Sequence, residues 1–78
     1  MVNIKLETVQ QANELVDIFK SYEEEVDVLR GRYCIDGKSF LGLIELIGSF
    51  ASVSINTDSI EVKNKFIAEV EAFNKKWQ

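Results

Sequence analysis

The alternation of apolar and polar residues predicts a strand and then a helix at the beginning of the chain. Residues 2–7 alternate with a period of two, which indicates a strand with one face in water. From Val9 to Phe19, apolar residues recur every three or four positions and predict an amphipathic helix. Thr8 stands just before this stripe and is a candidate N-cap.

A β-hairpin and a short apolar helix are predicted in the middle of the chain. The segments 26–29 and 32–35 are rich in apolar residues, and Arg30-Gly31 between them suits a tight turn. A second helix is expected over Lys38–Ile47, with Gly48 as its stop signal. This helix carries more apolar surface than one buried stripe needs, so we expect part of that surface to be exposed.

The last third of the sequence predicts a fourth strand and a third helix. Residues 51–56 alternate again, and an apolar stripe from Val62 to Trp77 follows a cap at Asp58 or Ser59. The order βαββαβα predicts an α+β open-faced sandwich, in which three helices pack on one face of a four-stranded antiparallel sheet. With only 78 residues, the chain is expected to form a single domain over residues 1–78.

Composition narrows the class of protein. A net charge of −4 argues against nucleic-acid binding, so partners are expected to be proteins. The sequence shows no signal peptide and no apolar run that would span a membrane, which favours a cytoplasmic protein without membrane contact. Without histidine, and with Cys34 as the single cysteine, neither a structural zinc site nor any other metal or cofactor is expected. Cys34 lies in an apolar strand and is predicted to be buried.

Patterns typical of enzymes are incomplete in this chain. The stretch from Gly31 to Ser39 ends in Gly-Lys-Ser, but five residues separate its glycines where a phosphate-binding loop requires four. A serine or cysteine nucleophile would lack a histidine base, and no spacing points to another base. No catalytic residue is therefore predicted, and the protein is not expected to be an enzyme. Gln10 and Gln11 are interpreted as solvated amides without a role.

Ser39 allows two interpretations. A serine just before an apolar helical run is a favoured N-cap, which stabilises a helix by about 1 kcal/mol. The same hydroxyl beside Phe40 and Leu41 also suits phosphorylation, because helix N–H groups and the helix dipole favour a phosphate there. From position alone, the cap is the preferred interpretation.

The segment from Tyr22 to Leu46 resembles the middle of HPr, the small phosphocarrier of the bacterial sugar phosphotransferase system. Residues 38–46 are similar to that family's Lys-Ser, two apolar residues, Gly, two apolar residues, any residue, Leu. The resemblance implies the HPr fold. It also implies that Ser39 matches the serine that a dedicated kinase phosphorylates in low-GC Gram-positive bacteria. In that family the phosphoserine form is a corepressor that binds a catabolite-control transcription factor through the helix matching Ser39–Ile47.

The sequence departs from this family at its phosphoryl-carrying histidine. HPr has that histidine, followed one residue later by Arg-Pro, at the start of the first helix, where this chain has Glu7–Ala12. With no histidine, the chain has no imidazole to carry a phosphoryl group. The resemblance is thus to a histidine-less HPr paralogue, similar to catabolite-repression HPr. The matching arginine, which contributes to partner recognition in the family, is also missing.

The leading hypothesis is a non-catalytic, HPr-like regulatory or adaptor protein with Ser39 as a candidate phosphorylation site. Its candidate partners are HPr kinase and a transcription regulator. The predicted partner-binding residues are apolar side chains of the second helix: Phe40, Leu41, Ile44 and Ile47. An alternative is a small structural or self-associating module, a monomer or a weak homodimer, with no phosphotransferase role. A third possibility is an orphan ligand-binding domain.

Overall fold

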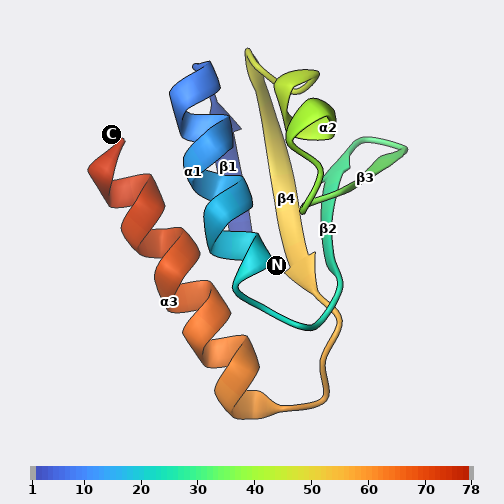
Figure 1. Cartoon of the computed structure of the whole chain (residues 1–78), viewed down its shortest axis with the longest axis vertical. Helices are drawn as coiled ribbons and strands as arrows, with labels where there is room; N and C mark the ends of the chain where they lie inside the picture. Colours follow the sequence, from blue (N-terminus) through green and yellow to red (C-terminus); the bar gives the residue numbers. More distant parts are fainter. Residues whose placement is uncertain (1, 78) are drawn as a thin grey trace.

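A computed structural model describes residues 2–77 as one layer of strands covered by helices (Figure 1). The predicted element order is confirmed. The elements are β1 (Val2–Leu6), α1 (Val9–Lys20), β2 (Val26–Arg30), β3 (Tyr33–Asp36), α2 (Phe40–Ile44), β4 (Ser49–Ile55) and α3 (Ile60–Lys76). None of the helices within residues 2–77 has the length and apolar character that crossing a bilayer requires.

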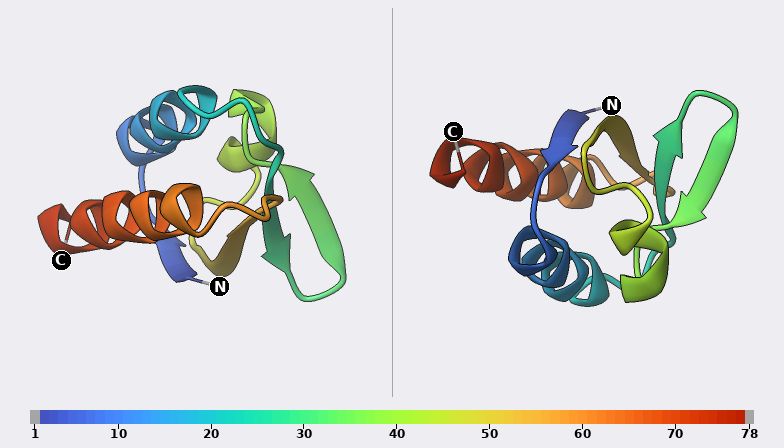
Figure 2. Two further views of the ribbon diagram at one scale, coloured as in Figure 1. Left: turned by 90° about the horizontal axis from the view of Figure 1, so that it is seen from below. Right: turned by 90° about the horizontal axis from the view of Figure 1, so that it is seen from above.

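The four strands form one antiparallel sheet in the order β1-β4-β2-β3. The views along the sheet in Figure 2 place the helices on the same side of it and leave the other side open. The predicted open-faced α+β sandwich is therefore confirmed. β1 and β3 are the two edge strands of this sheet.

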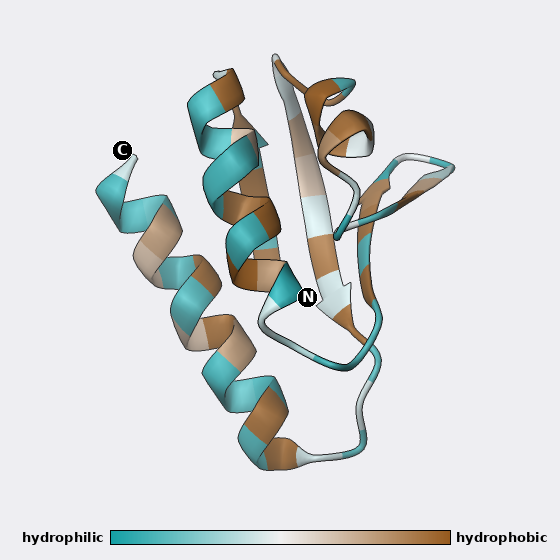
Figure 3. Cartoon of the chain, in the orientation of Figure 1, coloured by the Kyte–Doolittle hydropathy of each residue, from teal (hydrophilic) through white to brown (hydrophobic). Residues whose placement is uncertain are grey.

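The core lies between the sheet and the helices, where the apolar stripes of the sequence meet (Figure 3). Alternate strand residues such as Ile4 and Val53 are fully buried there, as a period of two requires. From the helices, the rings of Phe19 and Phe66 stack with their centroids 5.7 Å apart. These two rings join α1 to α3 across the middle of the core.

The hairpin differs from the sequence prediction by one residue. Arg30 pairs with Tyr33, so the turn consists of Gly31 and Arg32. Gly31 has φ of 57°, a left-handed conformation that glycine adopts without a Cβ clash. The prediction that Cys34 is buried is wrong. Cys34 is exposed because it lies on edge strand β3, opposite Leu29, on the face of the sheet that points away from α1, α2 and α3.

The second helix is shorter than the predicted Lys38–Ile47. After Ile44 the backbone tightens, because Leu46 and Ile47 donate to carbonyl groups three residues earlier instead of four. Gly48, with φ of 91°, then turns the chain into β4. Leu46 remains buried although it lies beyond the helix. The apolar pattern had therefore marked a buried turn as well as a helix.

Candidate protein-binding surface

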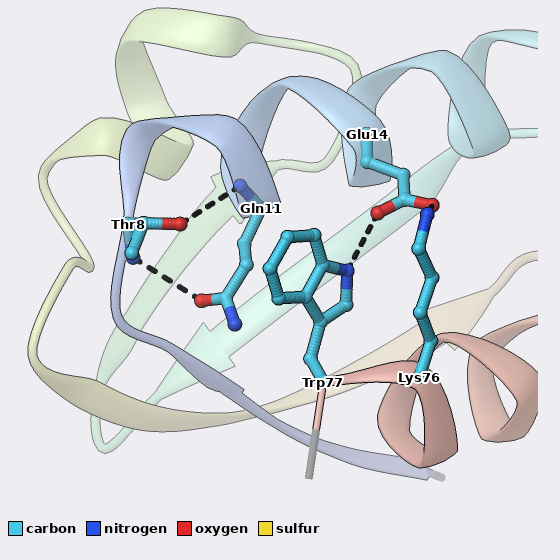
Figure 4. Close-up of polar contacts among 5 residues, drawn as sticks. All are labelled: Thr8, Gln11, Glu14, Lys76 and Trp77. Carbon is cyan, nitrogen blue, oxygen red and sulfur yellow. Dashed lines mark hydrogen bonds and ion pairs between the residues drawn. The ribbon is translucent and has the colours of Figure 1, made fainter.

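The N-terminus of α1 is capped by reciprocal hydrogen bonds between Thr8 and Gln11 (Figure 4). The backbone N–H of Gln11 donates to Thr8 Oγ1 at 3.1 Å. In return, the side-chain oxygen of Gln11 accepts from the backbone N–H of Thr8 at 3.1 Å and from that of Glu7 at 2.7 Å. This is a capping box, and it confirms Thr8 as the N-cap.

Gln11 therefore has a structural role that the sequence prediction missed. Its residue is only 3% exposed, so the interpretation of Gln11 as a solvated amide is wrong, whereas Gln10 is exposed as expected. The signal was available in the spacing, because Thr8 and Gln11 match the threonine and glutamine of a capping box. The Gln11 oxygen occupies backbone N–H groups that an anion at this helix start would otherwise use.

Ser39 is the N-cap of α2, as the first of its two interpretations predicted. Its Oγ accepts a hydrogen bond from the backbone N–H of Gly42 at 3.1 Å, and its side chain is half-buried. The backbone N–H of Ser39 donates to the Asp36 carbonyl at 3.0 Å. The turn between β3 and α2 therefore holds the Ser39 hydroxyl in a fixed position.

The glycine of the Lys-Ser motif is needed for close packing. A Cβ on Gly42 would lie 2.5 Å from Cγ2 of Ile35 and 3.3 Å from Oγ of Ser39. α2 thus rests against β3 at a distance that only glycine permits. This contact fixes how the apolar side of α2 is presented.

The apolar residues of α2 and of the turn that follows it differ in their exposure. Leu41 is 75% exposed, whereas Phe40, Ile44 and Ile47 are half-buried. Phe40 and Ile44 also pack against the edge of the core. The structure thus brings the four predicted partner-binding residues to one region, with Leu41 as its most accessible member.

The start of α1 lies at the same end of the molecule as α2 (Figure 1). Gly48, after the turn that follows α2, donates to the Leu6 carbonyl at 2.7 Å, just before α1. Val9, in the first turn of α1, is 53% exposed. We call the residues Val9, Ser39, Phe40, Leu41, Ile44 and Ile47 the α1/α2 surface.

The Lys38 side chain is hydrogen-bonded to the loop after α1. Its ammonium donates to the Tyr22 carbonyl at 2.6 Å, which ties the start of α2 to the loop after α1. The Tyr22 hydroxyl in turn donates to the Glu69 carboxylate of α3. Burial and this carboxylate raise the pKa of Tyr22 above its ordinary value. As the structure stands, Lys38 is not directed at the Ser39 hydroxyl.

The end of α3 is fastened to α1 by Glu14 (Figure 4). Its carboxylate accepts from the Lys76 ammonium at 2.7 Å and from the Trp77 indole N–H at 2.6 Å. These two hydrogen bonds, from Lys76 first and then from Trp77, lower the pKa of Glu14 below its ordinary value. The bonds hold the C-terminal end of α3 against α1.

Cys34 and the carboxylates of residues 2–77 are further candidate groups. Partial desolvation and the Asp27 carboxylate raise the pKa of the Cys34 thiol, which is the opposite of what a nucleophilic cysteine needs. Among residues 2–77 there is no group of three or more cysteine, aspartate and glutamate side chains arranged to hold a metal ion.

The arrangement of these elements matches a known structure. A crystal structure described as HPr-C-His from Thermoanaerobacter tengcongensis superposes on this chain with a TM-score of 0.69 and 18% sequence identity. The match covers 95% of this chain and 93% of that chain. The chain has the HPr fold. No protein-family model and no curated protein sequence matches it.

Proposed function

We propose that this protein is a non-catalytic, HPr-like regulatory or adaptor protein related to the sugar phosphotransferase system and located in the cytoplasm. It binds protein partners through the α1/α2 surface, and phosphorylation of Ser39 changes which partners bind. The chain has no histidine, so phosphohistidine relay is not part of the proposed activity. HPr kinase and a transcription regulator are the candidate partners.

The exposure of Leu41 next to the Ser39 cap is the observation that carries the proposal. A leucine that is 75% exposed contributes little to folding, but its burial by a partner would be favourable by about 1 to 2 kcal/mol. The half-buried side chains of Ile44 and Ile47 continue the apolar area around it. Such a cluster suits protein docking better than catalysis.

Phosphorylation of Ser39 would alter this surface through charge. A phosphoserine brings about −2 charge and replaces the hydroxyl that now accepts from Gly42. Because Lys38 donates to Tyr22, the phosphate would remain available to a cationic group of a partner. The modified form is therefore expected to favour basic docking surfaces, and the unmodified form apolar ones.

Intact-protein mass spectrometry after incubation with HPr kinase and ATP tests the modification. One added phosphate that disappears in Ser39→Ala supports the proposal. Ser59→Ala is the matched control, because Ser59 caps α3 with the same geometry and its hydroxyl accepts from Val62. No added phosphate, or a phosphate that persists in Ser39→Ala, would refute Ser39 as the regulated residue.

The same exposed residues leave self-association as the second candidate function. If two copies cover each other's Leu41, the protein is a small self-associating module. Sedimentation velocity over a hundredfold range of concentration separates the two candidates. A dimer that Leu41→Asp dissociates would favour self-association, whereas a constant monomeric mass would favour a different protein as the partner.

A further inference from the structure

The outer edge of β1 is fastened to the protein at two points by side-chain amides. β1 pairs with β4 on one side, and no strand within residues 2–77 pairs with its other side. On this outer side, Asn74 Nδ2 donates to the Asn3 carbonyl at 2.8 Å. Further along the chain, just after β1 ends, the backbone N–H of Glu7 donates to Gln11 Oε1 at 2.7 Å.

Between these two points, Lys5 presents an unused donor and an unused acceptor. Backbone groups alternate sides along an antiparallel strand, so the N–H and C=O of Lys5 point outward like the bonded groups of Asn3 and Glu7. The Leu6 carbonyl agrees with this alternation, since it accepts from Gly48 on the β4 side. No side chain of residues 2–77 bonds to the backbone of Lys5.

A cleft of about 300 Å³ runs beside this stretch of backbone. Phe50, which is 70% exposed, and the Lys5 side chain line it from the open face of the sheet. Phe73 of α3 and its C-cap residue Trp77 also line the cleft. The main-chain groups of Lys5 thus adjoin a cleft whose lining includes aromatic side chains, and free main-chain groups beside side-chain pockets are the combination that recognises an extended peptide by strand addition.

We propose that the outer edge of β1 binds an extended peptide segment of another protein, with an acidic residue flanked by large apolar residues. The residue paired with Lys5 would project on the same face as the Lys5 ammonium, where a carboxylate is the complementary group. Within residues 2–77, that ammonium makes one ion-pair contact, at 4.0 Å with Glu7, and lies 5.2 Å from the centroid of the Phe50 ring. The flanking residues would project toward Phe73 and Trp77.

Charge argues against a second copy of this chain as the occupant. Antiparallel pairing of two β1 edges through their unused groups would place Lys5 of one copy directly opposite Lys5 of the other. Like charges in that position are destabilising. A peptide with glutamate opposite Lys5 forms the same two main-chain hydrogen bonds and gains an ion pair.

The test uses a fluorescein-labelled peptide of sequence Ser-Thr-Val-Glu-Phe-Thr-Ser, with fluorescence anisotropy and the amide spectrum of ¹⁵N-labelled protein as readouts. Binding with the largest amide shifts at Lys5 and its strand neighbours is expected. N-methylation of the peptide glutamate removes the donor to the Lys5 carbonyl and is expected to weaken binding on the order of tenfold. N-methylation of the adjacent phenylalanine, whose N–H points away from β1 in antiparallel pairing, should have a much smaller effect. A Kd that does not respond to the first methylation would overturn the proposal.

Charge exchange provides the second arm of the test. The Lys5→Glu protein should bind a peptide with lysine in place of glutamate more tightly than it binds the glutamate peptide. The wild-type protein should show the opposite preference. Lys20→Glu is the matched control, because it makes the same charge change at the exposed end of α1. This variant should prefer the glutamate peptide, as the wild-type protein does. Unchanged preference in Lys5→Glu, amide shifts confined to α2, or dimerisation in place of peptide binding would each overturn the assignment.

Discussion

The Glu14 carboxylate accepts a hydrogen bond from the Trp77 indole N–H at 2.6 Å, although 63 positions separate the two residues in the sequence. Lys76 donates to the other oxygen of the same carboxylate. A single side chain of α1 therefore holds the last turn of α3 through two donors. Because both bonds require the ionised carboxylate or are strengthened by it, their contribution to stability depends on pH.

Replacement of Glu14 by glutamine should make this pH dependence visible. Folding lowers the pKa of Glu14 below its ordinary value of 4.5. The ionised carboxylate therefore stabilises the fold fully at pH values above that ordinary pKa. This contribution is lost as the pH falls through the lowered folded pKa. Urea unfolding followed by circular dichroism should show wild type more stable than Glu14→Gln at pH 7, with a smaller difference at pH 3. An equal difference at both pH values would contradict the assignment.

Gln11→Ala tests the capping box at the start of α1. It removes a buried acceptor from two backbone N–H groups and is expected to reduce the free energy of unfolding by about 1 to 2 kcal/mol. Gln10→Ala is the control, because Gln10 is exposed and its replacement should change stability by less than about 0.5 kcal/mol. Gln11→Glu should keep most of the stability, since glutamate serves in the same box. Equal losses in the two alanine variants would show that the cap is not the cause.

Gly42→Ala should push α2 away from β3. The new Cβ would lie 2.5 Å from Cγ2 of Ile35, and overpacking of this kind destabilises a protein by about 1 to 3 kcal/mol. In the Ile35→Ala background, where Cγ2 is absent, the same glycine change should be less destabilising. Urea unfolding of the four proteins of this double-mutant cycle gives the coupling energy. Simple additivity would show that the Ile35 contact does not require the glycine.

Leu41 and Leu43 should respond differently although they are two positions apart. Leu43→Ala removes a fully buried side chain and is expected to lower the free energy of unfolding by about 2 to 5 kcal/mol. Leu41→Ser changes an exposed side chain and should alter stability by less than about 0.5 kcal/mol. Under the proposed function, Leu41→Ser instead weakens partner binding. A large loss of stability in Leu41→Ser would show that this leucine serves the fold.

Sequence patterns predicted the elements whose boundaries depend on near neighbours. Thr8 could be identified as a cap, and the cap of α3 could be narrowed to Asp58 or Ser59, because a cap bonds to a backbone N–H only three residues away. The structure shows that Ser59 is the cap of α3. The apolar stripes of α1 and α3 also emerged directly, since helical periodicity repeats many times within one long element. The end of α2 was placed too late because its apolar run continues into the turn that buries Leu46.

The candidate site could be predicted only in part. Ser39 and the four apolar residues Phe40, Leu41, Ile44 and Ile47 were proposed from local pattern and resemblance to HPr, but their differing exposure depends on how α2 packs against β3 at Gly42. Cys34 was misplaced because alternation along a strand does not reveal that the strand is an edge or which face is left uncovered.

The sequence by itself determined the element order, the fold class and the absence of histidine from this chain, because composition and periodicity are local properties. Tertiary structure alone decided how deeply Gln11 is buried and that Glu14 meets Trp77. It also decided that the backbone of Lys5 lies on the outer edge of β1, beside a cleft whose lining includes Phe50, Phe73 and Trp77. Contacts between residues far apart in the sequence depend on how the sheet and helices pack in three dimensions. A one-dimensional pattern fixes which side of each element is apolar, but not which partner that side meets.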